Sequence, residues 1–380
     1  MQTSMCSKRR HGDMQTGRRM KYQQNSACIH CIDRKMLGQQ TPQPRLTRLE
    51  KKHRSSRSSA SSISSSPMAL HPTYQTELLE ATHLQDLELM MQWCTSTYKT
   101  MARSPTSETL WQTTIPALSL RHPPLRQGLL ALSALHLASK TSSSRRWQYL
   151  ETARAHQSQA LAALSSTELN LETDPNTKFA LCCLMIAFAF GYCLIDDDDN
   201  DKPDTLHEFF EVLQLTRWLV SIIMPLLERV ATGELNPLIQ PEDPRPTMPD
   251  MSRLVVLSLR RQNALEKLRD PAHEESLYES AIEHLSIALE QLMKGGEPKV
   301  FAFCWCFRIP TGFLELLEAR RPFALVILAH YAVVLHHLRD SWWMGDWGMQ
   351  ILSRIGDSLE PEWRALVGWP VDATGCFISP

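Results

Sequence analysis

One pair of cysteines has a spacing that suits a metal ion. Cys28 and Cys31 are separated by two residues, a spacing that lets two thiolates bind one Zn²⁺. A structural zinc site needs four ligands, and His30 and the distant Cys6 are candidates for the other two. A Cys-x-x-Cys pair alone is also compatible with two ordinary thiols. The spacing is therefore compatible both with a zinc site and with two cysteines that bind no metal.

Acidic residues cluster from Asp196 to Asp201, directly after an apolar stretch. The run resembles the Mg²⁺ motif of all-α terpene cyclases, but no Asn/Asp-x3-Ser/Thr-x3-Glu motif follows it. It does not fit a Ca²⁺ loop, because Lys202 occupies the position that needs glycine. We expect a solvated acidic loop. Since the sequence also has no Gly-rich phosphate loop or nucleophile motif, we expect a protein that is not an enzyme.

Three histidines, His330, His336 and His337, lie on or near one predicted helix. Their spacing differs from the i, i+4 pattern that brings two imidazoles to one metal ion. We expect them to be packing or surface residues.

Aromatic residues and glycines gather near the end of the chain, in Trp342, Trp343, Gly345, Trp347 and Gly348. Glycine lets the backbone turn tightly, and an indole ring offers a large apolar face with one N–H donor. Such residues suit a pocket for an apolar ligand, with the helix expected over 323–335 as one wall. They equally suit the core of a helical array, since large aromatic side chains are usually buried.

The elements that must position these residues are α-helices. From Glu77 onward, apolar residues recur at intervals of three and four, while proline lies between the periodic segments. No segment shows the period of two that marks a strand. We predict an all-α fold of stacked antiparallel helices. The expected helices are 77–94, 106–118, 123–140, 145–165, 176–195, 205–232, 252–269, 275–294, 311–319, 322–340 and 349–359.

The formal net charge of −1 conceals two regions of opposite charge. Residues 1–57 hold 14 Lys and Arg against 3 Asp and Glu, and the remainder holds 26 against 38. We predict a basic, largely disordered head over 1–54, a Ser-rich linker over 55–75 and one helical domain over 76–380.

No secretory signal is recognisable at the start, so the cysteines are expected to be reduced thiols. The apolar run 179–195 is short for a membrane span, and we expect a buried helix there.

The basic head resembles the second half of a fungal six-cysteine binuclear zinc cluster. Residues 18–21, Arg-Arg-Met-Lys, match the basic stretch of that family, and Cys28 and Cys31 match its fourth and fifth ligands. The remaining ligand positions are occupied by other residues, so two of the six zinc ligands are found. The resemblance implies zinc as cofactor and DNA as partner, contacted by the basic residues Arg18, Arg19, Lys21, Arg34 and Lys35.

The region from about 77 to 372 resembles the regulatory domain of fungal zinc-cluster transcription factors of the sterol uptake control type. The resemblance is carried by residues 86–98, 129–138 and 156–161, by the tryptophan loop within 336–352, and by 359–370. It implies an all-helical regulatory domain, often dimeric, with a pocket for a sterol or another lipid. The implied ligand-binding residues are Trp343, Met344, Gly345, Trp347 and Gly348.

The sequence therefore predicts a fungal regulator of RNA polymerase II transcription, controlling sterol or secondary-metabolite genes. The expected location is the nucleus, with shuttling to the cytoplasm, and the expected partners are DNA, a lipid and a second copy or related factor. One alternative is a regulator that does not read DNA sequence and acts by dimerisation or sequestration. A third is an enzyme of the terpene cyclase type.

Overall fold

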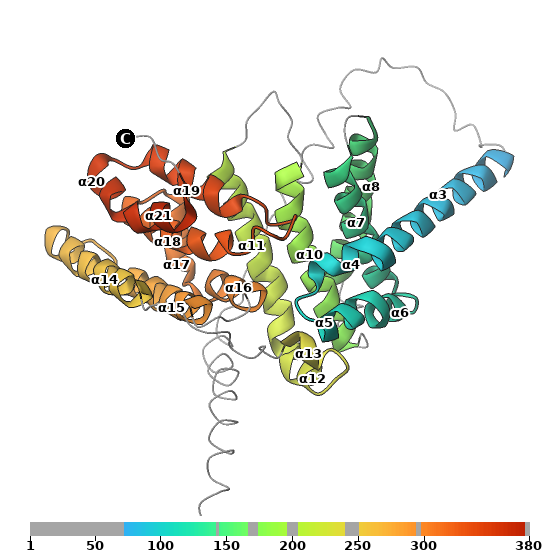
Figure 1. Ribbon diagram of the computed structural model, residues 1–380, viewed down its shortest axis with the longest axis horizontal. Coiled ribbons are helices and arrows are strands. Elements are labelled where there is room, and N and C mark those ends of the chain that lie inside the picture. Colours follow the sequence, from blue (N-terminus) through green and yellow to red (C-terminus); the bar gives the residue numbers. More distant parts are fainter. Residues whose placement is uncertain are drawn as a thin grey trace, which may run out of the picture. The chain divides into compact units, whose positions relative to one another are not determined.

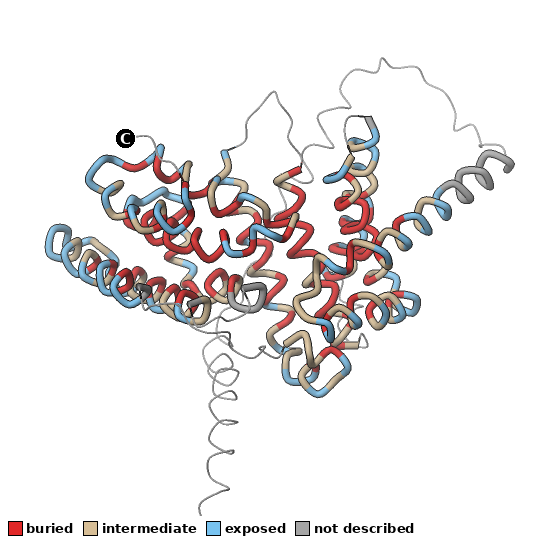
Figure 2. Tube along the Cα trace, viewed as in Figure 1, coloured by how far each residue is buried: buried red, intermediate tan, exposed pale blue. Residues whose placement is uncertain are grey.

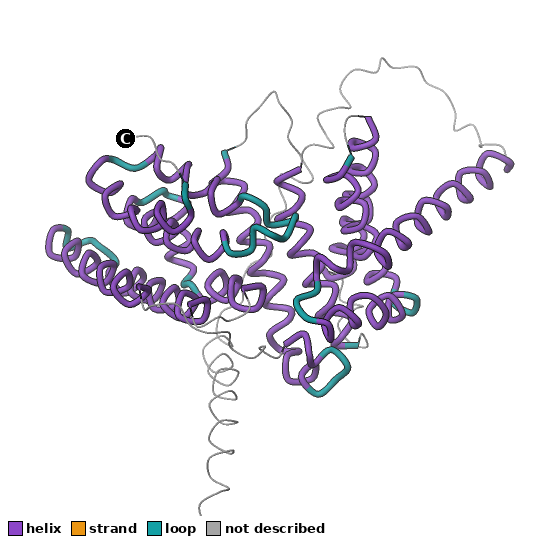
Figure 3. The backbone as a smooth tube through the Cα atoms, viewed as in Figure 1, coloured by secondary structure: helices purple, strands orange, loops and turns teal. Residues whose placement is uncertain are grey.

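In the computed structural model of the protein, the described residues are 72–141, 144–165, 174–195, 204–239, 251–293 and 298–376. These ranges consist of helices joined by turns, and no strand occurs within them (Figures 1 and 3). The predicted all-α fold is confirmed for this part of the chain. The predicted head over 1–54 and the acidic run over 196–201 lie outside it.

The first set of helices extends from residue 72 to residue 195. It comprises α3 (Pro72–Gln92), η1 (Trp93–Thr97), α4 (Tyr98–Met101), α5 (Pro105–Thr109), η2 (Leu110–Thr114), α6 (Ile115–Ser119), α7 (Pro123–Lys140), α8 (Ser144–Ser165) and α10 (Pro175–Ile195). The α7 and α8 helices form an antiparallel pair because only a short connection separates them.

The second set follows from residue 205. It comprises α11 (Thr205–Ile223), η3 (Met224–Leu226), α12 (Leu227–Ala231), α13 (Asn236–Ile239), α14 (Met251–Arg269), α15 (Glu275–Met293), α16 (Pro298–Arg308), α17 (Thr311–Glu318), α18 (Pro322–His336), α19 (Trp347–Ser358), α20 (Pro361–Arg364), η4 (Ala365–Val367) and α21 (Gly368–Thr374). Within this set, the sequence did not predict α13, α16, α20 or α21. The helix expected over 322–340 ends at His336.

The core is built around α7, α10 and α18, whose residues are mostly buried (Figure 2). In α18, every residue from Phe323 to His336 is buried. The α10 helix packs against α7, α8 and α11, whereas α18 packs against α15, α19 and α21. The α11 helix joins the two sets because it contacts α10 as well as α16 and α19.

Two short π-helical turns bring a pair of tryptophans together near α3. Trp93 lies in η1 and Trp111 in η2, and both side chains are buried. The Trp93 indole N–H donates to the Trp111 carbonyl at 2.8 Å, and the two rings meet edge to face at 6.2 Å. A π-turn shifts the helical register by one residue, which the period of 3.6 does not anticipate.

Two segments, Pro175–Ile195 and Thr205–Ala231, are long and apolar enough to cross a bilayer by length and composition. In this structure, 72% of the most apolar stretch of Pro175–Ile195 is buried, and the helix is surrounded by α7, α8 and α11. It is the buried helix that the sequence predicted over 179–195.

Candidate functional site

The tryptophan loop connects α18 to α19 through a compact turn. The backbone N–H groups of Met344 and Gly345 both donate to the Ser341 carbonyl, at 2.8 and 2.9 Å. Gly345 has φ +43°, in the left-handed region that suits glycine and is less costly for Asn or Asp than for other residues. The turn brings all five predicted ligand-binding residues together.

The side chains of Trp343, Met344 and Trp347 are buried. The Trp347 indole donates its N–H to the carbonyl of Phe190 on α10 at 3.0 Å, and its ring contacts Phe190 and Phe209. Trp347 therefore holds α19 against α10 and α11, as the interpretation of these tryptophans as core residues expects.

Two glycines allow backbones to approach closely around the loop. A Cβ atom on Gly348 would lie 2.6 Å from the Ala332 carbonyl oxygen and 2.7 Å from the His336 nitrogen, both on α18. A Cβ atom on Gly191 of α10 would lie 3.0 Å from the Cβ of Trp343. No local pattern in the sequence indicates this contact of Gly191, because the pairing of α10 with the loop depends on residues about 150 positions apart.

Two buried polar atoms of the loop, the indole nitrogens of Trp342 and Trp343, have no hydrogen-bond partner among the described residues. The buried hydroxyl oxygen of Ser133, three residues before His136 on α7, also has none among these residues. A buried N–H without an acceptor costs about 1–3 kcal/mol, and such groups are normally satisfied by water or a ligand. These donors make the loop a candidate site for a molecule that supplies acceptors.

His136 completes this candidate site. Its ring stacks on Trp342, with centroids 4.8 Å apart and an interplanar angle of 8°, and its Nδ1 lies 2.9 Å from the Thr97 hydroxyl. Burial, aided by the Lys140 charge, lowers the pKa of His136 to about 4, so the imidazole is neutral at pH 7. Sequence reasoning did not identify Ser133 and His136, although polar residues three apart on an apolar helix were a usable indication.

The histidines of α18 have the packing and surface positions that were expected. Nδ1 of buried His330 lies 2.8 Å from the Val326 carbonyl, and Nδ1 of exposed His337 lies 2.8 Å from the Val333 carbonyl. His336 is buried at the contact with Gly348.

The expected zinc site falls on residues that are not described. Cys28 and Cys31, together with the DNA-binding candidates Arg18, Arg19, Lys21, Arg34 and Lys35, precede residue 72. Two thiolates cannot complete the two tetrahedral shells of a binuclear cluster, so the ligands identified do not fit that cofactor. Among the described residues, no group of three or more His, Cys, Asp or Glu is placed to hold a metal ion.

The described residues form an all-helical fold, and the tryptophan loop lies within it. Residues 88–208, from α3 into α11, match the fungal specific transcription factor domain. A Zn(2)-C6 fungal-type transcription factor from Gibberella zeae is 22% identical over 313 residues, covering 75% of this chain and 61% of that relative. The chain thus spans less than two thirds of the relative's length. These matches confirm the resemblance to fungal zinc-cluster transcription factors.

Proposed function

We propose that the protein is a fungal transcription regulator that acts in the nucleus through its helical domain and shuttles to the cytoplasm. The observation that carries the proposal is the match of residues 88–208 to the fungal specific transcription factor domain. The charge of the chain agrees with it, because the basic residues 1–57 suit phosphate contacts while the remainder is acidic. In this proposal Arg18, Arg19, Lys21, Arg34 and Lys35 contact DNA.

We further propose that a sterol or another apolar ligand binds at the tryptophan loop and controls sterol or secondary-metabolite genes. The support is that the buried indole N–H groups of Trp342 and Trp343 have no acceptor among the described residues. A ligand oxygen near these donors would satisfy them. The proposed ligand-contacting residues are Trp343, Met344, Gly345, Trp347 and Gly348.

The Gly345→Asp variant tests the ligand site. A Cβ atom at Gly345 would lie 3.1 Å from the Leu194 side chain, so the new carboxylate enters the junction of α10 and the loop. Gly375→Asp is the matched control, because Gly375 also has positive φ, +67°, but has nothing within 4 Å of its Cβ position. We expect Gly345→Asp to bind a fluorescent sterol about tenfold more weakly, a loss of about 1.4 kcal/mol, and Gly375→Asp to bind like the original protein. Unchanged sterol affinity in Gly345→Asp would show that the tryptophan loop does not form the sterol site.

A second candidate is a regulator that does not read DNA sequence and acts by dimerisation with a second copy or a related factor, or by sequestering it. The zinc ligands favour it, since only Cys28 and Cys31 match the six positions of the cluster. Zinc content and DNA competition separate the candidates. Bound zinc with tighter binding to one DNA sequence supports direct reading, whereas zinc near zero with equal affinity for all sequences supports the second candidate.

A further inference from the structure

A cleft lies between α14 and the C-terminal segment, away from the tryptophan loop residues. It has a volume of about 220 Å³, and residues of α14, α18, η4 and α21 line it. The lining residues are Val255, Ser258, Leu259, Gln262, His330, Ala365, Leu366 and Trp369. None of them carries a permanent charge, so the cleft suits an uncharged molecule.

His330 of α18 provides a hydrogen-bond acceptor in this cleft. Its Nδ1 lies 2.8 Å from the Val326 carbonyl, which can only accept, so Nδ1 carries the proton. Burial lowers the pKa of His330 to about 4, so the ring is neutral at pH 7 and Nε2 has a free lone pair. No hydrogen bond to Nε2 occurs within the described residues.

Trp369 fixes the position of this acceptor. Its ring stacks on the His330 ring, with centroids 5.7 Å apart and an interplanar angle of 14°. The apolar side chains of Val255, Leu259 and Leu366 line the same cleft. A ligand in the cleft therefore meets apolar side chains, the polar side chains of Ser258 and Gln262, and the oriented acceptor of His330. This combination suits a hydroxyl group on an apolar body.

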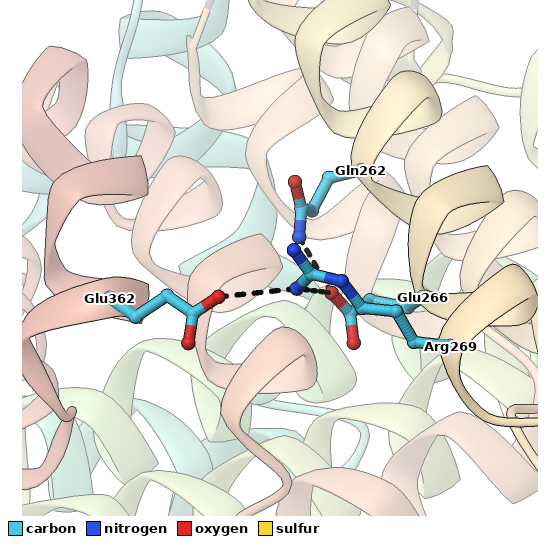
Figure 4. A network of polar contacts seen from close by, with 4 residues as sticks. All are labelled: Gln262, Glu266, Arg269 and Glu362. Carbon is cyan, nitrogen blue, oxygen red and sulfur yellow. Dashed lines mark hydrogen bonds and ion pairs between the residues drawn. The ribbon is translucent and has the colours of Figure 1, made fainter.

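A polar network that includes the cleft-lining residue Gln262 connects α14 with α20 (Figure 4). Arg269 of α14 reaches Glu362 of α20 at 3.2 Å and Glu266 at 3.0 Å, and the Gln262 amide donates to Glu266 at 2.7 Å. Exposed ion pairs of this kind contribute little stability. Their geometric effect is to hold α14 near α20, immediately before the η4 and α21 residues that line the cleft.

The volume sets the size of the ligand. A dry protein cavity of about 150 Å³ holds one benzene molecule, so about 220 Å³ suits one ring with small substituents. We propose that this cleft binds a small uncharged phenol or cyclic alcohol, whose hydroxyl donates to Nε2 of His330. The inference is independent of the ligand proposed for the tryptophan loop.

Calorimetric titration of the full chain with p-cresol and with toluene tests the proposal. The two probes share a methyl-substituted ring, but only p-cresol has a hydroxyl donor. We expect p-cresol to bind at least about tenfold more tightly than toluene, since a site with a buried acceptor discriminates against a ligand that leaves it unpaired. His330→Phe keeps a ring and removes the acceptor, so it should lose this preference.

His337→Phe is the matched control, because His337 makes the same contact to the carbonyl four residues earlier but is exposed. It should keep the preference for p-cresol. Leu366→Trp keeps His330 and fills the cleft, so it should weaken binding of both probes and decides the test if His330→Phe does not fold. The proposal is overturned if p-cresol does not bind, if toluene binds equally well, or if Leu366→Trp leaves p-cresol binding unchanged.

Discussion

At Gly348, the contact between α18 and α19 leaves no room for a side chain. The atoms nearest to an added methyl group would be the Ala332 oxygen at 2.6 Å and the His336 nitrogen at 2.7 Å, which belong to the backbone of α18. Because backbone atoms cannot move aside singly, Gly348→Ala must separate the two helices. We expect it to lower the free energy of unfolding by about 2–3 kcal/mol, measured by urea denaturation.

Gly368→Ala is the control for this substitution. Gly368 also has helical backbone angles, but no atom lies within 4 Å of its Cβ position. Alanine is the better helix former, so this variant should be as stable as the original protein or slightly more stable. Equal stability of both variants would contradict the close contact at Gly348.

Because two buried histidines are held neutral, we expect the protein to lose stability in mild acid. Burial lowers the pKa of both His136 and His330 to about 4, below the usual value near 6.5. Between these values the unfolded chain binds protons that the folded chain does not, so the free energy of unfolding falls as pH falls through this window. Each histidine accounts for up to about 3 kcal/mol over the whole window.

Urea denaturation at pH 7, 6 and 5 measures this effect. His330→Gln should reduce the dependence on pH, whereas His207→Gln should not, because the His207 side chain is 60% exposed. A free energy of unfolding that stays constant from pH 7 to pH 5 would show that the buried histidines are not held neutral.

At the residue level, sequence reasoning identified the tryptophan loop but not its neighbours. Glycines and tryptophans close together in the chain are visible as a local pattern, and Gly345 does adopt positive φ. His136 and Gly191 meet the loop through contacts between distant segments, and no local pattern encodes such contacts.

At the level of the elements, a side chain from α11 caps the C-terminal end of α16. Arg217 of α11 donates from Nη1 to the carbonyls of Cys306 and Ile309, at 2.7 and 2.9 Å, at the C-terminal end of α16. The last carbonyls of a helix have no partner within it, and a cation there also interacts favourably with the helix dipole. We expect Arg217→Met to lower the free energy of unfolding by roughly 2 kcal/mol.

Gln214→Met on the same helix provides the comparison, since Gln214 is exposed and its side-chain amide donates to the Glu318 carboxylate. It should change stability by less than about 0.5 kcal/mol. Similar losses in the two variants, measured by thermal or urea unfolding, would show that Arg217 does not cap α16.

Most helices were predictable because one face of each is apolar and proline marks where they begin. Pro105, Pro123, Pro322 and Pro361 all lie in the first turn of a helix, as the sequence analysis expected of prolines between periodic segments. The α16 helix was missed because its sequence from Val300 to Phe307 is apolar throughout and shows no periodicity. The π-turns at Trp93 and Trp111 were missed because they interrupt the period itself.

For the whole molecule, the charge distribution divides the chain into a basic part and an acidic part, to which we assign different functions. The basic residues 1–57 carry the potential for phosphate contacts, while the acidic remainder contains the domain match at 88–208 and both candidate ligand sites. Composition indicated this division, but it does not identify the ligand, because the sites are formed by side chains from separate helices.

The central claim is that the helical domain regulates transcription. Its most direct test is a reporter assay in fungal nuclei, with the full chain fused to an unrelated sequence-specific DNA-binding domain. Because the added domain supplies DNA binding, the result does not depend on the two remaining zinc-ligand positions, Cys28 and Cys31. We expect the fusion to raise or lower reporter transcription relative to the added domain alone. Unchanged reporter transcription, with the fusion present in the nucleus at the same level, would contradict it.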